Sequence, residues 1–162
     1  MKSNFPLLTF SDISRGNLDI AKLLLKKGAD PNVGTRADGY PMWLADRKGD
    51  LSLIKLLVEK GGDINEDFSG DGNVMIQAAK KGKVDLLDAL IEMGADVNRG
   101  VKGDGNPLIM AAKYGHFEAV DLLISRGADV NKSWRDGFSS MRVSVLHSRW
   151  LEKTAIEMLK NT

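Results

Sequence analysis

The stretch DGNPLIMAAKYGHFEAVDLLISRGADVN, from Asp104 to Asn131, carries the signals for two short helices separated by a turn. Its opening Asp-Gly favours a turn, and Pro107 suits the first turn of a helix, where a missing N–H costs nothing. Apolar residues then recur at helical spacing, and Gly115 and Gly127 stand where glycine commonly ends a helix. The stretch therefore predicts a helix, a tight turn, a second helix and an extended loop.

The same pattern recurs along the chain. The asparagines Asn32, Asn65, Asn98 and Asn131 are spaced 33 residues apart, and the aspartates and glycines two and four positions before them keep the same step. A single pair of short helices cannot bury its own apolar face, so the repeats must stack. The period predicts an all-α repeat solenoid of stacked helix-loop-helix repeats joined by β-turn or hairpin loops.

The 33-residue step, the turn-helix-loop-helix order and the G-A-D-V-N ending resemble the ankyrin repeat. The resemblance covers residues 9–159 and implies helix pairs stacked in an L-shaped array, with hairpin-like loops on one side. We expect one domain made of an N-terminal capping repeat, three central repeats and a degenerate C-terminal capping repeat. The expected boundaries are 1–34, 35–67, 68–100, 101–132 and 133–162.

The chain departs from the family where ankyrin repeats often read Thr-Pro-Leu-His. The three central repeats read YPMW, NVMI and NPLI, beginning at Tyr40, Asn73 and Asn106. We expect Asn73 and Asn106 to replace the local hydrogen bonds of the missing threonine. Asp12 stands at an alanine position, and a Val-Ser pair replaces Ala-Ala in the last repeat. Atypical ends are expected of capping repeats.

Composition fits a globular protein with a core. The chain has 162 residues, of which 43% are hydrophobic and 28% charged, and its formal net charge is +1. This balance offers no bulk-charge reason for a nucleic-acid or membrane partner. The chain has no cysteine, which fits a reducing compartment. We find no signal-peptide pattern and no run of about 20 apolar residues, and therefore expect a soluble, cytoplasmic protein.

Residues that could carry catalysis have simpler structural interpretations. His116 follows a helix-ending glycine, where ankyrin repeats often carry histidine, and His147 has no evident partner. An aspartate recurs at the same position in every repeat, whereas a catalytic pair of carboxylates would occur only once. We therefore expect these aspartates to form hydrogen bonds with the backbone of the turns. The GDGN stretches lack the lysine and strand context of phosphate loops. We predict no enzyme activity, no cofactor and no metal.

Positions that vary between repeats are expected to face outward. On ankyrin arrays the usual contact surface comprises the loop tips and the exposed side of the first helices. The loop tips span 33–37, 66–70, 99–103 and 132–135, and they carry Arg36, Phe68, Lys102, Trp134 and Arg135. Phe68 and Trp134 could anchor a partner or fold back over neighbouring loops, and Tyr40 could do either.

The second variable set lies just before each glycine that ends a first helix. Its members are Ser14, Arg15, Arg47, Lys48, Lys80, Lys81, Lys113 and Tyr114, with Val145 and Leu146 in the last repeat. Because packed helices lie about 10 Å apart, we expect the basic residues to align as a stripe on the concave side. A solvated face without a partner is the alternative. Trp43 has Ile76, Ile109 and Met141 at matching positions; these four form either an apolar floor beside the stripe or packing between repeats, which we favour.

These features predict a non-enzymatic protein-protein interaction module that acts by scaffolding or steric blocking and is monomeric by itself. The basic stripe predicts a partner with an acidic contact segment. One alternative is an inhibitor or immunity-type regulatory partner of an enzyme. Nucleic-acid binding along the stripe is a weaker alternative, because the chain has no nucleic-acid motif and a net charge near zero. We expect no membrane partner.

Overall fold

The computed structural model describes residues 18–33, 40–68, 72–103, 105–132, 134–135 and 140–141. The chain falls into two compact units. The first unit comprises Met1–Val74 and Glu92–Ala95, and the second comprises Met75–Ile91 and Asp96–Thr162. The expected first helix of the N-terminal cap, and nearly all of the C-terminal cap, lie outside the described residues.

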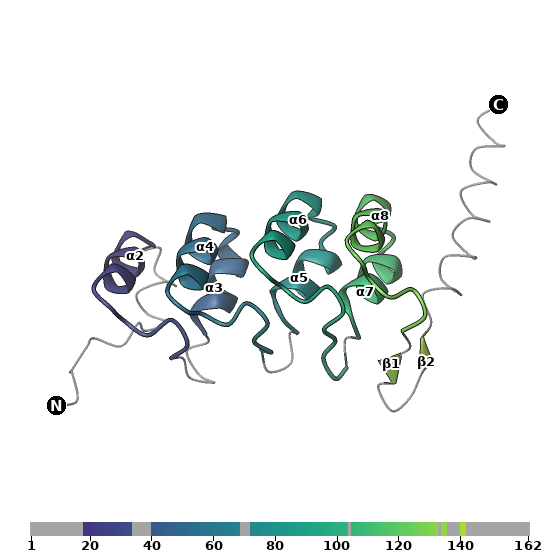
Figure 1. Cartoon of the computed structure of the whole chain (residues 1–162), viewed down its shortest axis with the longest axis horizontal. Coiled ribbons are helices and arrows are strands. Elements are labelled where there is room, and N and C mark those ends of the chain that lie inside the picture. Colours follow the sequence, from purple (N-terminus) through teal and green to yellow (C-terminus); the bar gives the residue numbers. More distant parts are fainter. Residues whose placement is uncertain are drawn as a thin grey trace. The chain divides into compact units, whose positions relative to one another are not determined.

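Helices make up most of the described chain (Figure 1). The first unit contains α2 (Leu18–Lys26), α3 (Pro41–Lys48) and α4 (Leu51–Glu59), and both α2 and α3 pack against α4. The second unit contains α5 (Val74–Lys80), α6 (Val84–Glu92), α7 (Pro107–Tyr114) and α8 (Phe117–Ser125). The exceptions are Val74, the first residue of α5, and Glu92, the last residue of α6, which belong to the first unit. Two short strands follow, β1 (Trp134–Arg135) and β2 (Ser140–Met141).

The predicted period is visible in the helices themselves. Leu51, Val84 and Phe117 begin α4, α6 and α8, so successive second helices start 33 residues apart. An isolated bridge from Val101 to Gly105, between α6 and α7, and the antiparallel pairing of β1 with β2, after α8, show hairpin-like turns. The prediction of an all-α repeat array with hairpin loops is confirmed.

The ends of the first helices explain why the chain turns where it does. In α7, the Asn106 side chain accepts a hydrogen bond from the Ile109 N–H at 2.8 Å, which satisfies a backbone donor left over at the helix start. Gly115 ends this helix with a φ of 75°. This left-handed conformation is energetically unfavourable for any residue that has a side chain. Gly49 ends α3 in the same way, with a φ of 69°. The expected capping role of Asn106 is confirmed.

The cores consist of small and branched residues at matching positions. The alanines Ala45, Ala78 and Ala111 of the first helices are fully buried, and so are the leucines Leu57, Leu90 and Leu123 of the second helices. Alanine lets backbones approach closely, while leucine fills the space between packed helices. Ile76 and Ile109 are buried too, which confirms the packing interpretation for them; Trp43 is half-buried.

The recurring aspartates and asparagines hold the turns together. Each described asparagine N–H in this set donates to the carboxylate two residues earlier, at 2.8 or 2.9 Å. The Asn98 amide also donates to the Gly127 carbonyl at 3.0 Å and accepts from the Asp129 N–H at 2.8 Å. Asn32 makes the equivalent pair of bonds in the first unit, at 3.0 and 2.9 Å. The predicted structural role of these residues is confirmed, and the asparagine joins consecutive turns as well.

Candidate functional site

In the first unit, the end of α3 presents two cations. Arg47 and Lys48 are exposed in its last turn, directly before Gly49. The Arg47 guanidinium lies 4.7 Å from the centroid of the Trp43 ring, one helical turn earlier, so a cation–π contact holds it over the indole. The predicted residues Trp43, Arg47 and Lys48 therefore lie together on one stretch of α3.

In the second unit, the ends of α5 and α7 are brought together by His116. Its Nε2 lies 2.9 Å from the Lys80 carbonyl oxygen at the end of α5. A Cβ on Gly82 would lie 2.5 Å from the imidazole Nδ1, so this glycine leaves the room that the ring needs. His116 itself follows Gly115 directly, and α7 ends at Tyr114. The predicted structural role of His116 is thus confirmed, since it fixes one first-helix end beside the next.

Cationic side chains predominate at these two ends. Lys81 and Lys113 are exposed, Lys80 is half-buried, and Tyr114 is 53% exposed. The sequences of α5 and α7 contain no acidic residue. The acids of this unit's helices belong instead to α6 and α8: Asp85, Asp88, Glu118 and Asp121. Opposite charges are therefore separated between first and second helices in the second unit. Whether the cations of the two units align as one stripe stays a prediction.

Phe68 corrects one of the loop predictions. Its side chain is only 5% exposed, and its ring stacks on that of Tyr40 with centroids 6.5 Å apart. The Phe68 N–H also donates to the Gly72 carbonyl at 2.7 Å. The prediction of Phe68 as an exposed anchor is wrong, because a neighbouring aromatic ring was available to cover it. The alternative, folding back, holds for Phe68 and half-buried Tyr40.

The remaining loop predictions have mixed outcomes. Lys102 is exposed at the tip of the hairpin closed by Val101 and Gly105. Arg36 lies outside the described residues, and so do the side chains of Trp134 and Arg135, whose backbone forms β1.

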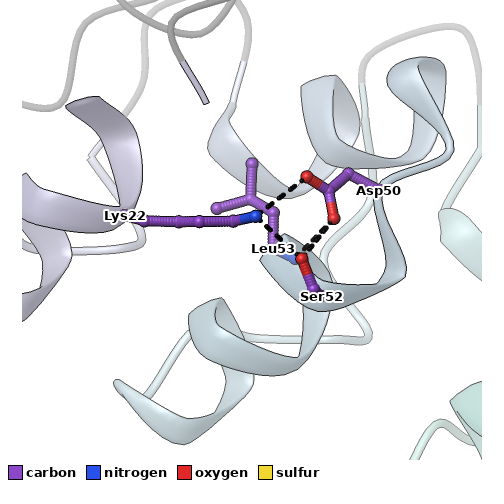
Figure 2. A network of polar contacts seen from close by, with 4 residues as sticks. All are labelled: Lys22, Asp50, Ser52 and Leu53. Atoms are coloured by element: carbon purple, nitrogen blue, oxygen red, sulfur yellow. Dashed lines mark hydrogen bonds and ion pairs between the residues drawn. The ribbon is translucent and has the colours of Figure 1, made fainter. Parts of the chain in front are cut away.

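A polar network at the start of α4 is a feature that the sequence reasoning missed (Figure 2). The Asp50 carboxylate accepts from the Leu53 N–H at 3.0 Å and from the Ser52 hydroxyl at 2.6 Å. The Lys22 ammonium, on α2, lies 3.3 Å from the carboxylate and donates to Ser52 at 2.8 Å. An aspartate directly before an apolar helix is a capping signal that could have predicted this site. The network ties α2 to α4.

Two carboxyl groups of the first unit have displaced pKa values, in opposite directions. Burial raises the pKa of Asp50, but the hydrogen bonds from Ser52, the Leu53 N–H and Lys22 outweigh it, so the net pKa is lowered. Burial raises the pKa of Glu66, and the nearby charges of Asp63 and Asp67 raise it further.

Within the described ranges, no three histidine or acidic side chains gather as ligands of a metal would. None of the helices described is both long enough and apolar enough to cross a membrane.

Comparison with known protein families identifies the repeats. A model described as ankyrin repeats in three copies matches residues 41–133, which is more than half of the chain. A model of ankyrin repeats in many copies matches residues 108–160, and a model of the single ankyrin repeat matches residues 4–36. A search of curated proteins found no match. The helix pairs, the 33-residue period and these matches agree, and the chain belongs to the ankyrin repeat family.

Proposed function

We propose that this chain is a non-enzymatic interaction module that binds another protein through its loop tips and the ends of its first helices. Ankyrin repeats are generally protein-protein interaction modules. The observation that carries the proposal is the exposure of Arg47, Lys48, Lys81 and Lys113 at those ends. An acidic segment of the partner is the complementary surface, because oppositely charged patches steer association and select against wrong partners.

The scaffold suits this role for a physical reason. Buried alanines and leucines and the turn hydrogen bonds fix the helix ends before any partner arrives. A surface that is already ordered loses little conformational entropy on binding, so more of the contact energy appears as affinity. Binding of this kind acts by scaffolding or by steric blocking. The cytoplasmic location, the monomeric state and the division into five repeats stay predictions.

Affinity capture from the native source, followed by mass spectrometry, identifies the partner. Its affinity is then measured over a range of salt concentrations with the wild-type chain, with Lys48→Glu and with Lys81→Glu. We expect both reversals to weaken binding and to reduce its dependence on salt. Lys55→Glu is the matched control, since Lys55 is an exposed lysine on the second helix α4. Equal affinities and salt slopes for all four proteins would contradict the proposal.

The same experiment separates the alternatives. If the captured protein is an enzyme, an activity assay with and without the chain tests the inhibitory form of the proposal. If nucleic acid binds instead, the logarithm of the binding constant falls steeply with the logarithm of salt concentration, as counterions are released from phosphates. That result would replace the protein partner by a nucleic acid.

A further inference from the structure

Two positions of the first helices, one helical turn apart, hold different residues in α3 than in α5 and α7. In α3 they hold Trp43 and Arg47, and the matching pairs in the other two helices are Ile76 with Lys80 and Ile109 with Lys113. Both isoleucines are buried, whereas Trp43 is half-buried and Arg47 is exposed. Only α3 of these three helices therefore combines an aromatic ring with a guanidinium.

The contact between the ring and the guanidinium restricts how Arg47 can lie. Its Cζ atom lies over the Trp43 indole, 4.7 Å from the ring centroid, and a cation within about 6 Å of that point is attracted by the ring. Arg47 remains exposed, so its N–H donors still meet solvent. A guanidinium offers those donors as a planar fork that matches a carboxylate with two parallel hydrogen bonds, whereas a lysine ammonium acts as a point charge.

No acidic side chain of the described residues occupies these donors. The Arg47 guanidinium forms no ion pair or hydrogen bond with any other side chain in the part of the chain that the structure describes. Asp46 is the one acid in the sequence of α3, and it is only 1% exposed. The Asp50 carboxylate, beyond the helix end, already accepts hydrogen bonds from Ser52 and from the backbone of α4. The end of α3 thus presents a restrained guanidinium to a partner.

We propose that Arg47, held by Trp43, recognises a carboxylate of the acidic partner segment by geometry, and that Lys48 beside it contributes charge alone. The carboxylate belongs to an aspartate or glutamate and accepts two parallel hydrogen bonds from the guanidinium. Because the ring already restrains Arg47, less side-chain entropy is lost on binding. This inference rests on the proposed function and deepens it, since it assigns the orientation of the partner segment to one residue of the first unit.

The first test changes the donor geometry and keeps the charge. The isotope-labelled chain is titrated with a short synthetic polyglutamate peptide, and the backbone amides and the side-chain Nε–H of Arg47 are followed by NMR. We expect the peptide to shift this Nε–H resonance. Arg47→Lys, which places in α3 the residue of the matching positions, should weaken binding roughly threefold to tenfold, the range of one hydrogen bond to a charged group. Lys48→Arg is the matched control and should not weaken it.

The second test asks whether Trp43 acts through Arg47. Trp43→Ile should weaken binding roughly twofold to fivefold, the range of an exposed cation–π contact, whereas Trp43→Phe keeps an aromatic face and most of the affinity. In the Arg47→Lys chain, Trp43→Ile should have little further effect. Additive losses would overturn the role given to Trp43, because independent contributions add.

Two results would overturn the role given to Arg47. They are equal affinities of the wild type and Arg47→Lys for the peptide, and an Arg47 Nε–H resonance that the peptide leaves unmoved. In either case the effects of Lys48→Glu and Lys81→Glu on the captured partner decide the proposed function independently. If Trp43→Ile does not fold, the comparison of Arg47→Lys with Lys48→Arg still decides, because both side chains are exposed.

Discussion

Asp50 and His116 stand at the same repeat position, two repeats apart, and they tie a second helix to the preceding repeat by different chemistry. Asp50 caps α4 and faces the ammonium of Lys22 on α2 at 3.3 Å. His116 makes no side-chain cap on α8 and instead contacts the Lys80 carbonyl at 2.9 Å. The repeat determines where a second helix contacts the preceding repeat. The residue at that position decides whether this junction depends on charge, as at Asp50, or on the fit of a ring, as at His116.

Gly82→Ala should disturb the shape-dependent junction most. The left-handed φ of 62° disfavours any side chain, and the new Cβ would displace the His116 ring and its hydrogen bond. We expect the free energy of unfolding to fall by about 2 to 3 kcal/mol, from backbone strain plus one lost hydrogen bond. Urea unfolding measures the loss, and hydrogen exchange of α6 and α8 amides shows whether it falls in the second unit.

Gly115→Ala is the matched control for this change. Its φ is 75°, but a Cβ there would meet nothing within 4 Å. We expect only the backbone cost, about 1 to 2 kcal/mol. Equal losses for the two variants would show that His116 does not need the space above Gly82.

Asp50→Ala should weaken the charge-dependent junction by about 1 to 2 kcal/mol, because the α4 N–H groups lose their cap. Asp50→Asn keeps an acceptor for the Leu53 N–H and loses only the ion pair with Lys22, so we expect a loss of at most about 1 kcal/mol. Urea unfolding at low and high salt separates the two contributions. A salt dependence that is the same in Asp50→Asn as in the wild type would argue against the ion pair.

Acid should weaken the junction that contains Asp50. Because the folded-state pKa of Asp50 lies below its ordinary value of 3.8, its stabilisation is complete above that value and is lost as pH falls through the lower, folded-state pKa. The stability difference between the wild type and Asp50→Asn should therefore be largest near neutral pH and shrink below about pH 4. A difference that stays constant from pH 7 to pH 3 would contradict this account.

The smallest expected effect has the opposite sign. The pKa of Glu66 is raised above its ordinary value of 4.5, so the stability linked to its protonated form is complete at low pH and is lost as pH rises through the folded-state pKa. Glu66→Gln should stabilise the chain at pH 7, by about half a kcal/mol at most, and should give no gain in acid. Destabilisation at pH 7 would indicate that ionised Glu66 has a favourable partner.

The structural roles of the recurring residues could be predicted from the sequence, because the same residue type appears at the same position in several repeats. The turn hydrogen bonds of the recurring aspartates and the capping role of Asn106 follow from pattern and turn chemistry. The bonds by which Asn98 joins its turn to the next one were not predicted and come from the structure. Phe68 was not predictable in this way. Its ring is covered by Tyr40, which lies in the preceding repeat, and no local pattern shows which exposed-looking aromatic has such a neighbour.

The surface was predictable only in part. Sequence placed Lys48, Lys81 and Lys113 at helix ends, where the structure shows them exposed. The separation of charge between first and second helices occurs in the second unit, whereas α2 and α4 of the first unit carry lysines as well as acids. The contact that fixes two helix ends through His116 depends on the space above Gly82, which spacing along the chain does not reveal.

The most direct test of the central claim is to map the captured partner onto the chain by NMR. The claim is that the ends of the first helices form the recognition surface. We therefore predict that the amides perturbed on binding cluster at residues 47–49, 80–82 and 113–116, with smaller changes along α4, α6 and α8. Perturbations centred on the acidic second helices, with the lysines at the first-helix ends unaffected, would contradict it.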